Sequence, residues 1–117
     1  MGRLSTHVLD TSRGQPAAGI EIRLSIFEGG HARHIKTAFT NGEGRTDEPL
    51  LAEAQLAAGR YELVFGAGAY FRALGEKLLE PPFLDEVVIR FGVADPSANW
   101  HVPLLIAPYG YSTYRGS

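Results

Sequence analysis

The sequence predicts an all-β sandwich, and three observations lead to this prediction. About seven or eight short stretches have strand character and follow one another at a spacing of roughly ten residues, as in two-sheet β domains. Within several of them apolar and polar residues alternate, which is the period of a half-buried strand. Turn-forming glycine, proline, asparagine and aspartate residues separate them, and we interpret only one stretch as a helix.

Length and composition limit the classes of protein that fit. A chain of 117 residues with 44% hydrophobic and 21% charged residues is typical of one globular domain, so we expect a single domain over 1–117. The net charge of −2 offers no basic surface to nucleic acid, and the apolar runs are too short to cross a membrane. The absence of cysteine excludes disulfides, thiol nucleophiles and cysteine-based zinc sites. Residues 1–10 lack a signal-peptide pattern, so we expect a cytoplasmic protein.

The first half of the chain predicts strands joined by tight turns. Residues 4–10 form a short candidate strand, which the turn-forming stretch 10–16 ends. Residues 19–27 alternate cleanly, and a returning strand is expected over 33–40 after a glycine-rich turn. A second strong turn lies at 41–44, because asparagine and glycine tolerate positive φ. The apolar face of the 19–27 strand comprises Ile20, Ile22, Leu24 and Ile26.

The second half contains the one helix candidate. Residues 50–58 have helical propensity, but we interpret them as a loop and a short strand because they lead directly into the strand at 60–65. Residues 68–77 carry apolar side chains at helical spacing, and we expect Pro81-Pro82 to stop this helix. Residues 86–92 alternate again and predict another strand.

The C-terminal segment is unusual for a chain end, because most termini are polar and loosely held. Aromatic and cationic side chains recur in it mainly two residues apart, which is the strand period. Such a strand is either an edge strand with incidental aromatic residues or the wall of a site. The side chains concerned are His101, Tyr109, Tyr111, Tyr114 and Arg115.

Two of the four histidines are candidate catalytic residues. His31 and His34 flank a glycine-rich turn, where we expect solvated side chains. His7 and His101 instead interrupt apolar, strand-like stretches. Each could simply be a hydrogen-bonded histidine within the fold, but two of them on different strands could share general-base work near neutral pH.

Arg45 opens the segment RTDEPL and has two interpretations. In the first, it forms a surface ion pair with Asp47 or Glu48, which contributes little stability. In the second, the planar donors of its guanidinium bind a carbonyl or enolate group. A metal site is disfavoured because the sequence contains neither HxH nor HExxH, and the serine-hydrolase motif GxSxG is absent as well. From the residues alone, the site would combine imidazole, guanidinium and phenol groups without specifying a substrate.

Several stretches resemble a known family. LSTHVLD (4–10) with GQPAAG (14–19), GRTDEPL (44–50), YELVFGAGAYF (61–71) and the terminal HVPLLIAPYGYSTYRGS are similar to signatures of the 5-hydroxyisourate hydrolases, the transthyretin-like proteins of purine catabolism. The resemblance covers essentially the whole chain. Its most specific element is the closing YRGS, which transthyretin proper, the hormone carrier of the same fold, lacks.

The resemblance implies a particular fold and assembly. The fold is a transthyretin-like (prealbumin-like) sandwich of two four-stranded sheets, with one short helix expected at 69–75. The assembly is a homotetramer, a dimer of dimers, whose active sites lie in a central channel lined by more than one subunit. The aromatic C-terminal strand would then be a wall of that channel.

The resemblance also implies the reaction. A hydroxyisourate hydrolase opens the ring of 5-hydroxyisourate at a cyclic amide C–N bond, giving 2-oxo-4-hydroxy-4-carboxy-5-ureidoimidazoline in urate degradation. His101 and His7 would activate water, either one being the general base, and Arg45 would hold the substrate and stabilise the oxyanion. The tail would complete the pocket, with no cofactor and no metal. Its residues are Tyr114, Arg115, Gly116 and Ser117, of which Tyr114 and Ser117 would form hydrogen bonds.

Two other functions compete with catalysis. A transthyretin-like carrier would bind a small ligand in the same channel, but it would not need His7, His101 and the YRGS tail. A structural or adhesive β-sandwich would need neither histidine. The mass of the protein in solution separates these possibilities in part, because a monomer would be incompatible with a site shared between subunits.

Overall fold

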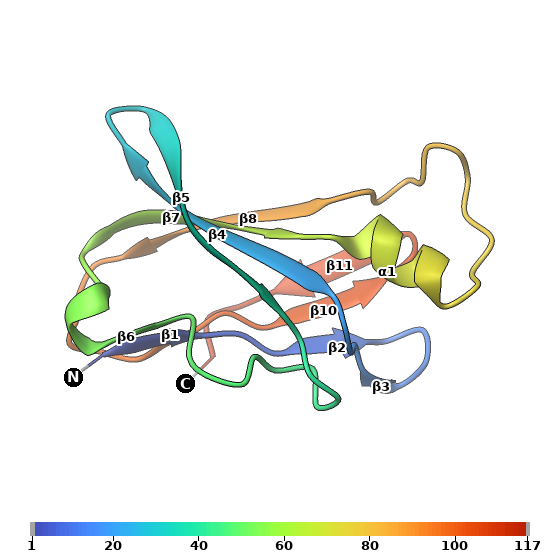
Figure 1. Cartoon of the computed structure of the whole chain (residues 1–117), viewed down its shortest axis with the longest axis horizontal. Coiled ribbons are helices and arrows are strands. Elements are labelled where there is room, and N and C mark those ends of the chain that lie inside the picture. Colours follow the sequence, from blue (N-terminus) through green and yellow to red (C-terminus); the bar gives the residue numbers. More distant parts are fainter. Residues whose placement is uncertain (1, 117) are drawn as a thin grey trace.

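The computed structural model describes residues 2–116, which form two facing layers of strands with one α-helix at an end of the molecule (Figure 1). In chain order, the elements are β1 (Arg3–Ser5), β2 (Val8–Asp10), β3 (Gln15–Pro16), β4 (Glu21–Glu28), β5 (His31–Phe39), β6 (Leu51–Ala52), the 3-10 helix η1 (Glu53–Gln55), β7 (Gly59–Phe65), α1 (Ala67–Ala73), β8 (Val87–Val93), β9 (Trp100–His101), β10 (Leu104–Ala107) and β11 (Gly110–Thr113).

One layer is a single four-stranded antiparallel sheet in the order β5-β4-β7-β8. Its strands agree closely with those predicted at 19–27, 33–40, 60–65 and 86–92. Alternation explains the success, because successive side chains of a strand point to opposite faces and one face here meets the core. The expected apolar face of β4 is confirmed: Ile20, Ile22 and Leu24 are buried, and Ile26 packs against the core.

The other layer contains two sheets, so the expectation of two four-stranded sheets is wrong in this detail. The strands of residues 2–116 form a four-stranded sheet in the order β11-β10-β2-β3 and a three-stranded sheet in the order β6-β1-β9. β1 and β2 follow each other along one line of the layer, as Figure 1 shows. β9 runs parallel to β1, and β10 runs parallel to β2.

The break between these two sheets has a local cause. Pro103 has no N–H to donate to a neighbouring strand. One residue earlier, the Thr6 hydroxyl donates to the Val102 carbonyl at 2.7 Å, where a backbone N–H would donate in a regular ladder. The main chain of His7 turns aside and bridges to Arg45. The interruption therefore places His7 in the break and His101 beside it.

The predicted helix is present but shorter than expected. It was predicted over 68–77, with 69–75 implied by the resemblance, and α1 covers Ala67–Ala73. Gly75 ends it, rather than Pro81-Pro82. With φ of +85°, Gly75 adopts the left-handed conformation, while the N–H of Glu76 donates to the carbonyl of Phe71 at 3.1 Å. This is the glycine-dependent end of a Schellman motif. No helix within residues 2–116 has the length and apolar character needed to span a membrane.

Residues 50–58 confirm the prediction of a loop and a short strand over that of a helix. The short strand is β6, and η1 follows it as a single 3-10 turn. Leu51 of β6 pairs with Leu4 of β1. Propensity is overridden here because sheet pairing buries Leu50 and Leu51 against the core, which an exposed helix would not achieve.

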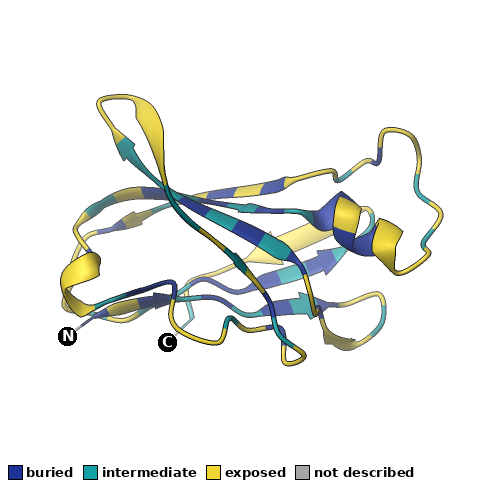
Figure 2. Ribbon diagram, in the orientation of Figure 1, coloured by how far each residue is buried: buried dark blue, intermediate teal, exposed yellow. Residues whose placement is uncertain are grey.

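The core lies between the two layers, and Figure 2 shows buried and exposed residues alternating along the strands that face it. A fully buried aliphatic side chain stabilises the fold by about 1.5–3 kcal/mol. These contributions hold β1, β2 and β10 firmly and so position the site residues next to them. The core residues include Leu4, Val8, Leu104 and Ile106 from one layer and Ile22, Leu24, Leu63, Phe65 and Ile89 from the other.

Asp10 is a fully buried carboxylate that ties β2 to helix α1. The Tyr70 hydroxyl donates to its Oδ2 at 2.8 Å, and the Ser12 hydroxyl donates to its Oδ1 at 2.5 Å. Burial alone would raise the pKa of Asp10, but hydrogen bonds from Ser12, Tyr70 and the backbone N–H groups of Arg13 and Ser12 hold that pKa below its usual value. Burial and Asp10 together raise the pKa of Tyr70 to about 12.

Replacing Tyr70 by phenylalanine is expected to lower the free energy of unfolding near neutral pH by about 1.5–3 kcal/mol, because a hydrogen bond to a charged group is lost. The folded-state pKa of Asp10 is depressed, so ionised Asp10 stabilises the fold above its unfolded-state pKa and loses this effect as pH falls through the folded-state pKa. The difference in free energy of unfolding between variant and wild type should therefore narrow as pH falls through the folded-state pKa of Asp10. Urea unfolding near neutral pH and in acid measures this difference.

Tyr61→Phe is the matched control for this measurement. The hydroxyl of this buried tyrosine donates to the carbonyl of Ala57 at 2.7 Å, so its loss removes a bond between neutral groups and should depend little on pH. If Tyr70→Phe were equally costly at neutral and acid pH, the contribution assigned to ionised Asp10 would be wrong.

Candidate active site

The structure brings three predicted site residues together at the break between the two sheets. His7 lies in the break itself and bridges to Arg45, which follows the turn at 41–44. His101 belongs to β9 and pairs with Ser5 of β1, two residues before His7. The charges of Arg45 and His7 both act on the imidazole of His101. Two histidines and one arginine thus share a single surface.

His101 is half-buried and held by a hydrogen bond. Its Nδ1 lies 2.9 Å from the hydroxyl oxygen of Ser5. Burial lowers the pKa of His101, and the nearby Arg45 and His7 lower it further. His101 is therefore mainly neutral near pH 7, and no residue between 2 and 116 forms a hydrogen bond to its Nε2. A neutral imidazole with an accessible nitrogen can accept a proton.

His7 has a different environment. Its Nε2 lies 2.9 Å from the carbonyl oxygen of Glu43. A carbonyl only accepts hydrogen bonds, so we assign the ring proton to Nε2, which leaves Nδ1 as the acceptor. Gly44 permits this approach: its φ is +77°, and a Cβ there would overlap the Val8 carbonyl and lie 3.3 Å from His7 Cδ2.

Arg45 does not form the surface ion pair that was one of its two interpretations. Its side chain is exposed, and no carboxylate of residues 2–116 lies within ion-pair distance of it. Asp47 instead accepts a hydrogen bond from the Asn41 side chain at 3.0 Å. The guanidinium can therefore meet an anion or a developing oxyanion without first breaking a contact with a carboxylate.

The C-terminal tail reaches the same surface through Gly116. Its N–H donates to the carbonyl of His101 at 2.7 Å, and a Cβ on Gly116 would lie only 2.6 Å from His101 Cδ2. Tyr114 is 60% exposed, whereas the guanidinium of Arg115 lies over the Trp100 ring, 3.9 Å from its centre. Ser117, also predicted for the site, lies outside the described residues.

Sequence reasoning did not single out Ser5, Glu43 or Trp100 as partners of the site residues. Strand alternation along residues 4–10 puts Ser5 on the same face as His7, but the contact of Ser5 with His101 joins positions 96 residues apart. That contact depends on the parallel pairing of β1 and β9, for which the sequence contains no local signal. The Glu43 contact uses a backbone carbonyl, so the residue type gives no indication of it.

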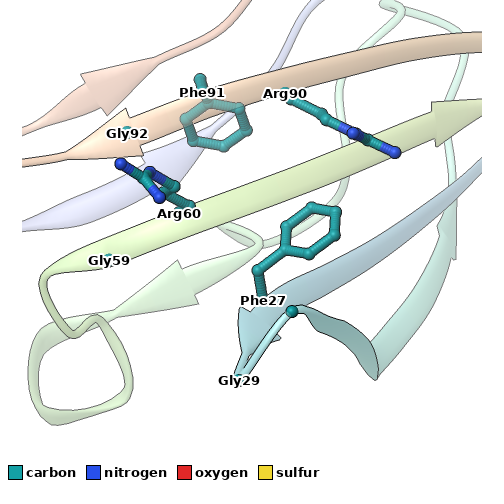
Figure 3. A pocket seen from close by; sticks show the side chains of 8 residues that line it. Phe27, Gly29, Gly59, Arg60, Arg90, Phe91 and Gly92 are labelled. Carbon is teal, nitrogen blue, oxygen red and sulfur yellow. The ribbon is translucent and has the colours of Figure 1, made fainter.

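A large hollow lies elsewhere. It measures about 780 Å³ and opens on the sheet β5-β4-β7-β8, where Figure 3 shows the guanidinium groups of Arg60 and Arg90 and the rings of Phe27 and Phe91 along it. None of the predicted site residues that the structure describes lines it. The chemical groups that suit catalysis are instead on an open surface. The described part of the chain contains no group of three side chains able to hold a metal ion.

Comparison with known proteins agrees with this fold. A family model described as HIUase/Transthyretin family matches residues 4–116. The 5-hydroxyisourate hydrolase of Mesorhizobium japonicum is 60% identical over 116 residues, covering 99% of this chain and 93% of that protein. The structure of Klebsiella pneumoniae 5-hydroxyisourate hydrolase matches with a TM-score of 0.82 and 40% identity, covering 100% of both chains.

A structure of sea bream transthyretin in complex with thyroxine also matches, with a TM-score of 0.87 and 26% identity, covering 97% of this chain and 94% of that one. Both solved structures match the fold of this chain, but one is named a hydrolase and the other is a transthyretin with bound thyroxine. At 60% identity over nearly its whole length, this chain is far more similar to the hydrolase of M. japonicum than to the thyroxine-bound protein. The chain belongs to the HIUase/Transthyretin family.

Proposed function

We propose that this chain is a hydrolase that converts 5-hydroxyisourate into 2-oxo-4-hydroxy-4-carboxy-5-ureidoimidazoline. The observation that supports it most directly is the neutral, Ser5-bound imidazole of His101 on the same surface as His7 and Arg45. A carrier of a small ligand would have no use for a poised base beside a guanidinium that forms no ion pair with any carboxylate of residues 2–116. The identity of the substrate is inferred from the relatives, which are named 5-hydroxyisourate hydrolase.

The reaction begins with a water molecule next to His101. Nε2 of His101 accepts a proton as the water oxygen attacks a ring carbonyl of the substrate. The carbonyl oxygen becomes an oxyanion, which the Arg45 guanidinium stabilises. Collapse of the tetrahedral intermediate breaks the adjacent C–N bond, and the leaving nitrogen takes the proton that His101 holds. Water is thus added across the amide bond, and the base is restored.

His7 supports the proton transfer. Because its Nε2–H is directed to the Glu43 carbonyl, its Nδ1 is the nitrogen that can take or return a proton. His7 shares the proton with His101 or relays it to solvent. The nearby His7 also lowers the pKa of His101, after burial and Arg45.

The active protein is a single-domain subunit, 1–117, of a homotetramer built as a dimer of dimers. Two features support an assembled site. His7, Arg45 and His101 lie on an open surface, and the exposed side chains of Tyr111 and Val88 project from the edge strands β11 and β8. A second subunit would close the channel over the tail Tyr114-Arg115-Gly116-Ser117, and Tyr114 would bond to or stack on the substrate. The protein would act in the cytoplasm.

The test of this function generates 5-hydroxyisourate in the cuvette with urate oxidase and follows its ultraviolet absorbance. We expect decay well above the spontaneous rate when the protein is present, and a tetramer by mass in solution. Decay at the spontaneous rate with folded, tetrameric protein would contradict the hydrolase and favour a ligand-binding protein. A fully active monomer would contradict the proposal that subunits share the active site, but not the proposal that the protein is a hydrolase.

Ser5→Ala should lower kcat by about 10- to 100-fold and change KM little, because a misplaced catalytic group loses this much reactivity. We assign the His101 ring proton to Nδ1, which then donates to the Ser5 hydroxyl and leaves the lone pair on Nε2. Ser5→Thr keeps the hydroxyl and should retain most of the activity. Steady-state kinetics of both variants, with Ser25→Ala on β4 as control, measures the effect; equal losses in the alanine and threonine variants would contradict it.

A further inference from the structure

The side chain of Arg115 lies against the protein's own surface and not against His101. Its guanidinium carbon lies 3.9 Å from the centre of the Trp100 ring, which is a close cation–π contact. Nη2 also donates to the Asn99 carbonyl at 3.1 Å. Both contacts fix Arg115 to the segment that immediately precedes His101.

Trp100 is well suited to act as a fixed platform. Its Nε1–H donates to the Asp95 carbonyl at 2.8 Å, which prevents the indole from rotating. Its main chain pairs with Leu4 in the parallel ladder between β1 and β9, and its ring packs against the core. Arg115 therefore stacks on a group that both a hydrogen bond and the sheet hold in place.

The residue after Arg115, Gly116, lies against the His101 imidazole. The Gly116 N–H donates to the His101 carbonyl at 2.7 Å, and the main chain of Gly116 comes so near the ring that a Cβ would lie 2.6 Å from Cδ2. A tail that left this position would remove one wall beside the His101 ring. Holding Arg115 on Trp100 holds Gly116 on His101, because the two residues are adjacent.

We propose that Arg115 is a positioning residue: its stacking on Trp100 latches the C-terminal tail so that Gly116 lies against His101. In this arrangement its guanidinium acts on Trp100 and Asn99 and does not contact substrate. The catalytic consequence rests on the proposed hydrolase function, whereas the latch itself is a property of the folded chain. The tetrad Tyr-Arg-Gly-Ser then has separate tasks for the arginine and the glycine.

The test compares Arg115→Met, Trp100→Leu and the double variant, each checked for folding by thermal unfolding. In Arg115→Met, the Gly116 amide should exchange its hydrogen faster, because the tail opens more often. The fluorescence of Trp100, the one tryptophan in the chain, should change as well. Each single variant should lower kcat/KM roughly 3- to 30-fold, the range that corresponds to losing a cation–π contact. The double variant should lose no more than the worse single variant.

Two further variants sharpen the comparison. Trp100→Phe keeps an aromatic ring and should recover most of the loss seen in Trp100→Leu, which also covers the case in which Trp100→Leu does not fold. Arg33→Met, an exposed arginine paired with Glu28 on the β4–β5 hairpin, should leave the Gly116 amide and kcat/KM unchanged.

Two results would overturn the latch. One is a wild-type exchange rate of the Gly116 amide in Arg115→Met. The other is a double variant whose loss is the product of the two single losses, which would indicate that Arg115 contacts substrate directly. If the wild-type protein did not hydrolyse 5-hydroxyisourate, the proposed function would fail, while amide exchange and fluorescence would still decide whether the latch exists.

Discussion

We expect His101→Asn to lower kcat by about 10²–10⁴-fold, the contribution of a positioned general base. Asparagine is close to histidine in size, and its amide can still form a hydrogen bond with Ser5, but it cannot accept a proton from water. The tail should remain in place, because Gly116 bonds to the backbone carbonyl of residue 101 rather than to its side chain. KM should therefore change much less than kcat.

The pH dependence provides a second measurement of the same residue. Burial, Arg45 and His7 keep the pKa of His101 below its usual value of about 6.5, so the wild-type enzyme should stay active to lower pH than an ordinary imidazole would allow. Activity should be lost as pH falls through that depressed pKa, because the base becomes protonated. His101→Asn should lack this acidic limb. His31→Asn, at the exposed hairpin turn, is the control, and an unchanged rate in His101→Asn would remove His101 from the mechanism.

Replacing Arg45 by glutamine should lower kcat/KM by about 10²–10³-fold, the effect of removing a donor that stabilises an oxyanion. The variant should also change the pH profile. After burial, Arg45 is the next contribution to the lowered pKa of His101, so removing its charge lets that pKa rise. The acidic limb of the pH profile of kcat/KM should therefore move to higher pH. Such a shift would show that Arg45 and His101 belong to one site, whatever the size of the rate loss.

Two variants complete this experiment. Arg45→Lys keeps the charge but loses the planar pair of donors, so it should preserve the position of the acidic limb while recovering only part of the rate. Arg60→Gln, an exposed arginine at the hollow on the other layer, should alter neither quantity. An Arg45→Gln protein with a wild-type acidic limb would contradict the electrostatic contact between Arg45 and His101.

The strands of the β5-β4-β7-β8 layer were predictable from the sequence because their signal is local. In 19–27, 60–65 and 86–92, burial of one face requires an apolar residue at every second position, and this pattern is readable without knowing the neighbouring strand. The helix was located for a similar reason. Its end was misplaced because Gly75 uses its left-handed conformation there, and a glycine within an apolar pattern does not by itself reveal that conformation.

The division of the second layer into two sheets could not be predicted in the same way. It depends on the Thr6 hydroxyl meeting the Val102 carbonyl, next to Pro103, across a parallel pair of strands from opposite ends of the chain. Each residue alone is compatible with a continuous strand or a strand end. Only the pairing shows that a hydroxyl replaces a ladder N–H at this point, and that His7 is directed toward Arg45 as a result.

By itself the sequence determined the all-β class with one helix, most strand positions and, through its resemblance to a family, the residue types from which a hydrolytic site could be built. The tertiary structure decided how those residues meet. Ser5 on His101, the Glu43 carbonyl on His7 and Arg115 on Trp100 join positions 96, 36 and 15 residues apart, the last from their numbering. Such contacts arise from strand pairing and chain packing, and a local pattern of residues carries no record of which distant atoms the fold brings within hydrogen-bonding distance.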